Sequence, residues 1–266
     1  MHSLLALLVA LTVLSNPGLA NRRHRAPTAT WERGPLFPTP EKPVIVVGLE
    51  KTGTSSISAY FKCGHVETKH WVCAGSTRRR RQTCGHCVYK NLRAGRPPLE
   101  SCGGNRTAVW AQLDVTSKPL PGGNSKLCFW PQVEALDQLK LHYPNATWVL
   151  NLRPVENWIR SVNHWVPDGM SLKERIKQCA ITGLPVGTGG EDSELTAFFI
   201  HHAERIRAFS KAHGITLVEL DIESPSAGNV METHFGISSD SCWKQANANH
   251  KSQAAAGADG DAQPLQ

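Results

Sequence analysis

The chain has 266 residues, of which 40% are hydrophobic and 19% charged, values that are ordinary for a globular protein and argue against disorder throughout. A chain of this length can bury one substantial core, which predicts one or two domains. The formal net charge of +7 suits anionic partners such as nucleic acid, an anionic membrane or small phosphate and sulfate ligands. A single run, Arg78–Arg81, supplies much of that excess.

The first twenty residues have the pattern of a targeting segment. Leu4–Leu14 is almost uninterruptedly apolar, about as long as a signal-peptide core and too short to span a bilayer comfortably. The small residues Gly18 and Ala20 stand at the positions that a signal peptidase reads. We therefore predict a signal peptide over 1–20, with an uncleaved anchor as the alternative because only His2 and the free amine precede the apolar run. Either way the folded part is expected in the secretory-pathway lumen, in the Golgi or secreted.

The first half of the chain begins with a Pro- and Arg-rich stretch, 21–42, which predicts a linker. A continuous β-branched run at 44–47 predicts a buried parallel strand, followed by a short helix over 55–61. The segment 63–107 is a Cys-rich insertion that we expect to be mostly loop. A second strand is predicted over 108–113.

The second half alternates more clearly between helical and strand patterns. The predicted elements are a helix over 133–141, a strand over 147–152, a helix over 155–165, a helix over 195–213 and a strand over 215–220. This alternation predicts an α/β fold with a central parallel β-sheet flanked by helices. The catalytic domain is expected over 43–250, and the Ala/Gly/Asp/Gln-rich tail 251–266 is expected to be disordered.

Eight cysteines fit an oxidising compartment. Five of them crowd into one stretch: Cys63, Cys73, Cys84, Cys87 and Cys102. Cys84 and Cys87 form one CxxC pair, which could seed a zinc site with Cys73 and Cys102, but the compartment favours disulfides. Asn105 and Asn145 lie in glycosylation sequons, as is common in lumenal chains.

The strongest functional signal is the segment Gly48–Ser56, which joins the first strand to the first helix. Its glycines let the backbone approach an anion, the free amides of the helix start point at that anion, and Lys51 adds a positive charge. In a nucleotide-hydrolysing P-loop the lysine follows the second glycine, but here Lys51 precedes Gly53. A magnesium-holding aspartate is also missing unless Asp114 serves, so a kinase is disfavoured.

This segment resembles the 5′-phosphosulfate loop of sulfotransferases that use 3′-phosphoadenosine 5′-phosphosulfate (PAPS). The resemblance implies a P-loop-containing sulfotransferase-like fold and places Lys51 at the transferred sulfate. It implies that the 5′-phosphate is held by Thr52, Gly53, Thr54, Ser55 and Ser56. Glu50 stands where the family often has proline.

A second motif matches the same family. Arg153 ends a buried strand and Ser161 lies eight residues later in the following helix, an arrangement similar to the family's 3′-phosphate motif. The segment 242–249 resembles the closing segment of some members, in which Lys244 could cover the nucleotide. The donor nucleotide is therefore expected to sit between two phosphate sites.

The base that deprotonates the acceptor has several candidates. Asp114 follows a predicted strand at the edge where cytosolic relatives place their catalytic histidine. His70 and Glu67 are the alternatives, because glycan-modifying members use a glutamate shortly after the first helix. The family chemistry implies no metal.

The leading hypothesis is an enzyme that transfers a sulfuryl group to a glycan or other secreted acceptor. A non-catalytic lumenal module that only binds the nucleotide is the alternative from a different class. Nucleic acid is not expected as a partner, and a membrane is expected only if the N-terminal segment stays as an anchor.

Overall fold

A computed structural model describes residues 33–74, 82–116, 127–166, 169–185 and 187–244. The predicted signal peptide and tail lie outside these ranges. Within them, seven strands form one sheet in the order β4-β3-β2-β5-β1-β8-β9. The strands are β1 (Val44–Val46), β2 (Thr68–His70), β3 (Val72–Ala74), β4 (Gln82–Thr83), β5 (Val109–Gln112), β8 (Thr147–Leu152) and β9 (Thr216–Asp221).

The five strands from β2 to β9 in this order are parallel to their neighbours, and β3 and β4 extend the sheet antiparallel. A separate two-stranded sheet pairs β6 (Val115–Thr116) with β7 (Cys128–Phe129). The predicted α/β class with a central parallel sheet is confirmed. The carboxyl ends of β2, β5, β1, β8 and β9 meet at one edge, where open α/β sheets bind ligands.

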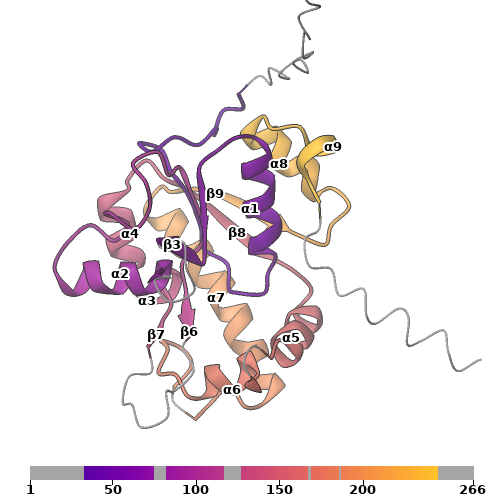
Figure 1. Ribbon diagram of the computed structural model, residues 1–266. Coiled ribbons are helices and arrows are strands. Elements are labelled where there is room, and N and C mark those ends of the chain that lie inside the picture. The colour runs from indigo at the N-terminus through magenta and orange to yellow at the C-terminus, as the bar shows by residue number, and fades with distance from the viewer. Residues whose placement is uncertain (1–32, 75–81, 117–126, 167–168, 186, 245–266) are drawn as a thin grey trace, which may run out of the picture. The chain divides into compact units, whose positions relative to one another are not determined.

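Helices cover both faces of the sheet (Figure 1). They are α1 (Thr54–Cys63), α2 (Cys84–Arg93), α3 (Pro131–Glu134), α4 (Leu136–His142), α5 (Val155–His164), α6 (Leu172–Lys177), α7 (Asp192–Ala212), α8 (Ala227–Phe235) and α9 (Ser239–Cys242). On β1, Val44 and Val46 pack with residues of α1 and α8, whereas Ile45 and Val47 pack with residues of α2, α4 and α7. A strand buried on both faces needs this continuous β-branched sequence.

Three predictions of local structure differ from the fold. The segment 63–107, expected to be mostly loop, contains β2 inside the parallel sheet as well as β3, β4 and α2. The predicted helix 133–141 is two helices, because Ala135 leaves the helical conformation with φ −131° and ψ 27°. In the predicted linker, Leu36 N–H donates to His234 O at 3.0 Å, so the part of this stretch near β1 is packed against α8.

All eight cysteines form disulfides: Cys63–Cys242, Cys73–Cys84, Cys87–Cys102 and Cys128–Cys179. The disulfide prediction is confirmed, and the zinc alternative is wrong because Cys84 and Cys87 each bind a different partner. Four disulfides indicate an oxidising secretory or extracellular environment. Within the described ranges, no helix is both long and apolar enough to cross a membrane.

The disulfide that spans the longest stretch of chain should matter most for stability. Cys63 and Cys242 are 179 residues apart and join the end of α1 to α9, whereas Cys73 and Cys84 are 11 residues apart. Chain entropy predicts a loss of about 5 kcal/mol for the long loop and about 3 kcal/mol for the short one. Denaturant unfolding of the two Cys→Ala double variants measures this difference. Equal losses would show that the disulfides act through local packing instead.

Candidate active site

The candidate site is centred on the loop between β1 and α1. At Gly48 a Cβ atom would lie 2.2 Å from Oδ1 of Asn151, so no other residue fits there. Gly53 has φ +87°, and a Cβ at this position would lie 2.7 Å from Cδ1 of Ile222. Lys51 also has a positive φ of 68°, which is unusual for a residue with a side chain. The loop therefore turns tightly around the start of α1.

The start of α1 is open to an anion. The hydrogen bonds of the helix begin with Ser56, whose N–H donates to Gly53 O at 2.9 Å. The amides of Thr54 and Ser55 precede this bond and make no hydrogen bond of the helix. Among the described residues no side chain caps this helix, and its first turn holds no acidic residue. The free amides and the helix dipole both favour a bound phosphate or sulfate.

Asn151, near the carboxyl end of β8, holds the loop in shape. Its Oδ1 accepts from Gly48 N–H at 3.1 Å and its Nδ2 donates to Thr52 O at 2.9 Å. The Thr52 side chain is fully buried, and its hydroxyl donates to Leu49 O. The Thr52 hydroxyl, predicted to bind the phosphate, is thus used within the loop, which leaves its backbone amide as the group that could bind an anion.

Arg153 lies directly beside the loop, as its position at the end of β8 predicts. Its Nη1 donates to Lys51 O at 3.1 Å, and its guanidinium forms an ion pair with Glu223, which follows β9. Asn157 Nδ2 donates to the same carboxylate at 2.5 Å. The buried Nε of Arg153 has no hydrogen-bond partner among the described residues. A buried donor without a partner marks a place where a ligand oxygen would fit.

The Lys51 side chain lies in partly buried, positively charged surroundings. Burial lowers its pKa, Glu50 raises it and Arg153 lowers it further. Its Nζ lies 5.1 Å from the centroid of the Trp165 ring, a cation–π distance. A bound anion would stabilise the desolvated Lys51 ammonium and the Arg153 guanidinium next to it. These two side chains therefore favour anion binding at this position.

His70, at the carboxyl end of β2, reaches the start of α1. A chain of hydrogen bonds runs from Asp114 Oδ2 to Gln112 Nε2 at 3.0 Å, from Gln112 Oε1 to the Thr54 hydroxyl at 3.0 Å, and from Thr54 Oγ1 to His70 Nε2 at 3.1 Å. Gln112 thus donates through its amide nitrogen to Asp114 and accepts through its amide oxygen from the Thr54 hydroxyl. The Thr54 hydroxyl then donates to Gln112 and accepts from His70 Nε2–H. This order leaves Nδ1 as the basic nitrogen of His70.

Asp114 and Glu50, a residue of the loop, form a buried carboxyl pair. Burial raises the pKa of Glu50 well above its usual range, and Asp114 raises it further, which favours a protonated Glu50. Glu50 Oε1 accepts from the Thr116 hydroxyl at 3.3 Å. Helix α2 packs tightly against Asp114, because a Cβ on Gly85 would lie 2.7 Å from the Asp114 carbonyl carbon. The Cys-rich segment therefore supports this part of the site.

The site lies within a stretch that comparison with known proteins assigns to a family. A family model described as a sulfotransferase domain matches residues 43–224, which include β1, the loop, Asp114 and Arg153. The chain belongs to the sulfotransferase family. A search of curated proteins gives no match to this sulfotransferase.

The remaining predicted residues of the sulfotransferase are spread more widely. Ser56 and Ser161 are buried on α1 and α5, and Lys244 is exposed after α9. The Ser55 hydroxyl lies 3.5 Å from His70 Nε2, so it belongs to the cluster at the start of α1. Glu67 precedes β2, is exposed and pairs with Lys69 at 2.9 Å. Because β2 is parallel to β5, Glu67 lies at the amino end of the sheet, away from His70.

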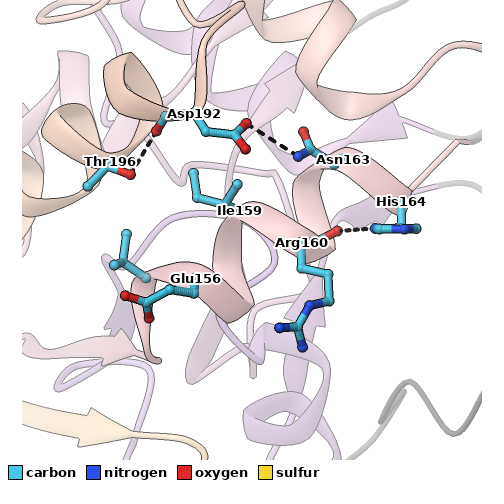
Figure 2. Close-up of a pocket in the computed structure, with 8 residues that line it drawn as sticks. Glu156, Ile159, Arg160, Asn163, His164, Asp192 and Thr196 are labelled. Carbon is cyan, nitrogen blue, oxygen red and sulfur yellow. Dashed lines mark hydrogen bonds between the residues drawn. The ribbon is translucent and has the colours of Figure 1, made fainter. Parts of the chain in front are cut away.

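A pocket of about 410 Å³ opens on the outer side of α5 (Figure 2). Its lining comes from α5 and from Asp192 and Thr196 at the start of α7, and Asn163 Nδ2 donates to Asp192 Oδ1 at 3.3 Å. None of the residues predicted to hold the donor lines it. The pocket is therefore distinct from the sulfotransferase loop.

Four residues at the site were not predicted from the sequence: Asn151, Glu223, Gln112 and Trp165. Asn151 carried the clearest signal, because an amide inside an otherwise apolar strand needs a specific partner. Glu223 and Gln112 follow or end strands at the ligand-binding edge, which a more systematic reading of strand ends could have found. Nothing in the local sequence marked Trp165.

Proposed function

We propose that this sulfotransferase transfers a sulfuryl group from PAPS to a hydroxyl or amine of a glycan or other secreted acceptor, in the Golgi lumen or after secretion. One observation carries the proposal: Arg153 donates to the carbonyl of Lys51, so the two predicted phosphate sites adjoin. No described side chain caps the start of α1, and the Arg153 Nε has no hydrogen-bond partner within the described ranges; both features fit a nucleotide with two separate phosphate groups.

The roles of the residues follow from their positions. The donor supplies the sulfuryl group and retains the negative charge that develops on its phosphate. Lys51 and the amides of Thr54 and Ser55 are placed to stabilise that charge, which is the main catalytic contribution expected for such a transfer. Arg153 orients the nucleotide, and Asn151 keeps the loop in shape before the ligand binds.

For the base we propose His70. It lies at the carboxyl edge of the sheet, where Nε2–H donates to the Thr54 hydroxyl and Nδ1 is left to accept the proton. Burial is the main cause that lowers its pKa, Lys62 lowers it further and Asp114 opposes the shift, so the ring is neutral near pH 7 and can accept a proton. Asp114 is buried and acts through Gln112 and Thr54, where it fixes the orientation of His70.

The pH dependence tests this assignment. Because the pKa of His70 is lowered, kcat/KM should fall only below about pH 6.5, as the ring becomes protonated, and stay level above it until Lys51, whose pKa is lowered by burial, loses its proton. His70→Gln should reduce kcat by about 100-fold or more and remove this acidic limb. If Asp114→Asn removes the limb while His70→Gln keeps it, Asp114 is the base instead.

The donor is tested by adding 3′-phosphoadenosine 5′-phosphate (PAP) and following the melting temperature, together with sulfate transfer from radiolabelled PAPS. Stabilisation by PAP with transfer to an acceptor supports the enzyme. Stabilisation without transfer to any glycan or protein pool supports the non-catalytic nucleotide-binding module. If PAP gives no stabilisation, the proposed donor site is wrong.

A further inference from the structure

Two tryptophans at the carboxyl edge of the sheet are unusually exposed. Trp110, Trp130, Trp148 and Trp158 are at most 5% exposed, whereas Trp71 and Trp165 are 41% and 40% exposed. A large aromatic side chain is normally buried, so an exposed ring beside an active site indicates a binding surface. Both rings belong to residues next to the proposed machinery: Trp165 contacts Lys51, and Trp71 directly follows His70.

Trp165 is held in a fixed place. It ends α5, its N–H donates to Ser161 O at 3.2 Å, and its carbonyl accepts from Leu172 N–H at 2.9 Å. Its ring centroid lies 5.1 Å from Lys51 Nζ and 5.7 Å from the guanidinium carbon of Arg175. A ligand that lies on the exposed part of this ring is therefore within a few ångströms of the amine proposed to hold the transferred group.

Trp71 supplies an independent sign of function on the other side of the site. Its backbone has φ +56°, a left-handed conformation that a residue with a bulky side chain rarely adopts. Its N–H donates to Gln112 O at 3.2 Å, and its carbonyl accepts from Cys84 N–H at 2.8 Å. These bonds keep the turn after His70 in place while the side chain stays exposed.

We propose that Trp165 is the acceptor-binding wall of the active site and that it seats the apolar face of a sugar ring of a neutral or anionic glycan. This inference rests on the proposed function. The C–H face of a pyranose packs flat on an indole ring, and its hydroxyls project from the edge. With the Lys51 ammonium and the Arg175 guanidinium over the indole ring, a neutral or anionic sugar is favoured over a cationic amine.

The test compares Trp165→Ala and Trp165→Phe with a matched control, Leu141→Ala. Leu141 is an exposed apolar residue of α4, near the amino end of β8 and so away from the site. The acceptors are an N-acetyllactosamine oligosaccharide, the anionic polymer chondroitin and a tyrosine peptide. The acceptor KM, the donor KM, kcat and the affinity for PAP are measured for each variant.

We expect wild type to sulfate at least one of the glycans in preference to the peptide. Trp165→Ala should raise the acceptor KM by about tenfold or more while PAP affinity changes less than about threefold, as for the loss of an aromatic anchor. Trp165→Phe should recover part of the loss and Leu141→Ala should behave as wild type. Titration of the PAP complex with the preferred glycan should also change tryptophan fluorescence in wild type but not in Trp165→Phe.

Other outcomes separate the two proposals. An unchanged acceptor KM in Trp165→Ala, or preference of wild type for the tyrosine peptide, overturns the acceptor wall and leaves the donor site intact. A fall in kcat alone would show that Trp165 only positions Lys51, which also overturns it. If the wild-type protein does not bind PAP, the proposed function itself is wrong.

Discussion

Replacing Lys51 by asparagine should reduce sulfate transfer by a factor of roughly a hundred to a thousand, the effect typical of removing one group that stabilises transition-state charge. The loss should appear in kcat, because the charge on the departing phosphate develops during the reaction. Asparagine is chosen because it tolerates a left-handed backbone, and Lys51 has φ 68°. The measurement is steady-state transfer from radiolabelled PAPS with acceptor at saturation.

Two controls make the Lys51 result specific. Lys51→Ala removes the same charge but strains the backbone, so a larger loss of stability in this variant than in Lys51→Asn would report the cost of the loop conformation. Lys211→Ala removes an exposed lysine of α7 and should leave turnover unchanged. Transfer by Lys51→Asn at the wild-type rate would contradict the catalytic role of Lys51.

Arg153→Ala should weaken PAP binding by about 10- to 100-fold, because charge-assisted hydrogen bonds to a phosphate contribute about 1.5–3 kcal/mol. The variant also loses the bond to Lys51 O and leaves the Glu223 carboxylate without its ion-pair partner, so it should be less stable than wild type. Isothermal titration with PAP and denaturant unfolding measure the two effects separately.

A double variant distinguishes ligand binding from fold stability at this position. Arg153→Ala combined with Glu223→Gln removes the unpaired carboxylate, so stability should recover while PAP affinity stays low. Arg153→Lys keeps the charge but loses the planar guanidinium and should give intermediate affinity. Recovery of PAP affinity in the double variant would show that Arg153 serves only to neutralise Glu223.

Local patterns predicted much of the fold and placed the loop and Arg153 of the candidate site together. The strand over 147–152 has the predicted bounds, and α5 and α7 differ from the predicted helices by a few residues. A strand, a glycine-containing turn and a helix start are adjacent in the chain, so Gly48–Ser56 could be recognised without knowledge of the tertiary fold. The position of Arg153 at the end of its strand was equally local.

The predictions failed where long-range packing overrides local pattern. The Cys-rich segment has little hydrophobic periodicity, yet β2 enters the sheet because β5 pairs with it and two disulfides hold the following turns and α2. The hydroxyl of Thr52 was expected to face the ligand, but the buried loop needs it as an internal donor. Only the fold shows that Glu67 lies at the amino end of the sheet, whereas His70 and Asp114 lie at the carboxyl ends of β2 and β5.

The sequence alone predicts an anion-binding loop of sulfotransferase type, because glycine, lysine and hydroxyl residues act through the backbone of a single turn. What surrounds that loop can be seen only in the tertiary fold. Asn151 reaches Gly48 across 103 residues, and Glu223 reaches Arg153 across 70. The order of the strands also decides which cysteines pair and which residues meet at the site. It brings His70 to Thr54 and the exposed Trp165 ring to Lys51. Hydrophobic periodicity records which face of an element is buried, but it does not record which residue lies opposite.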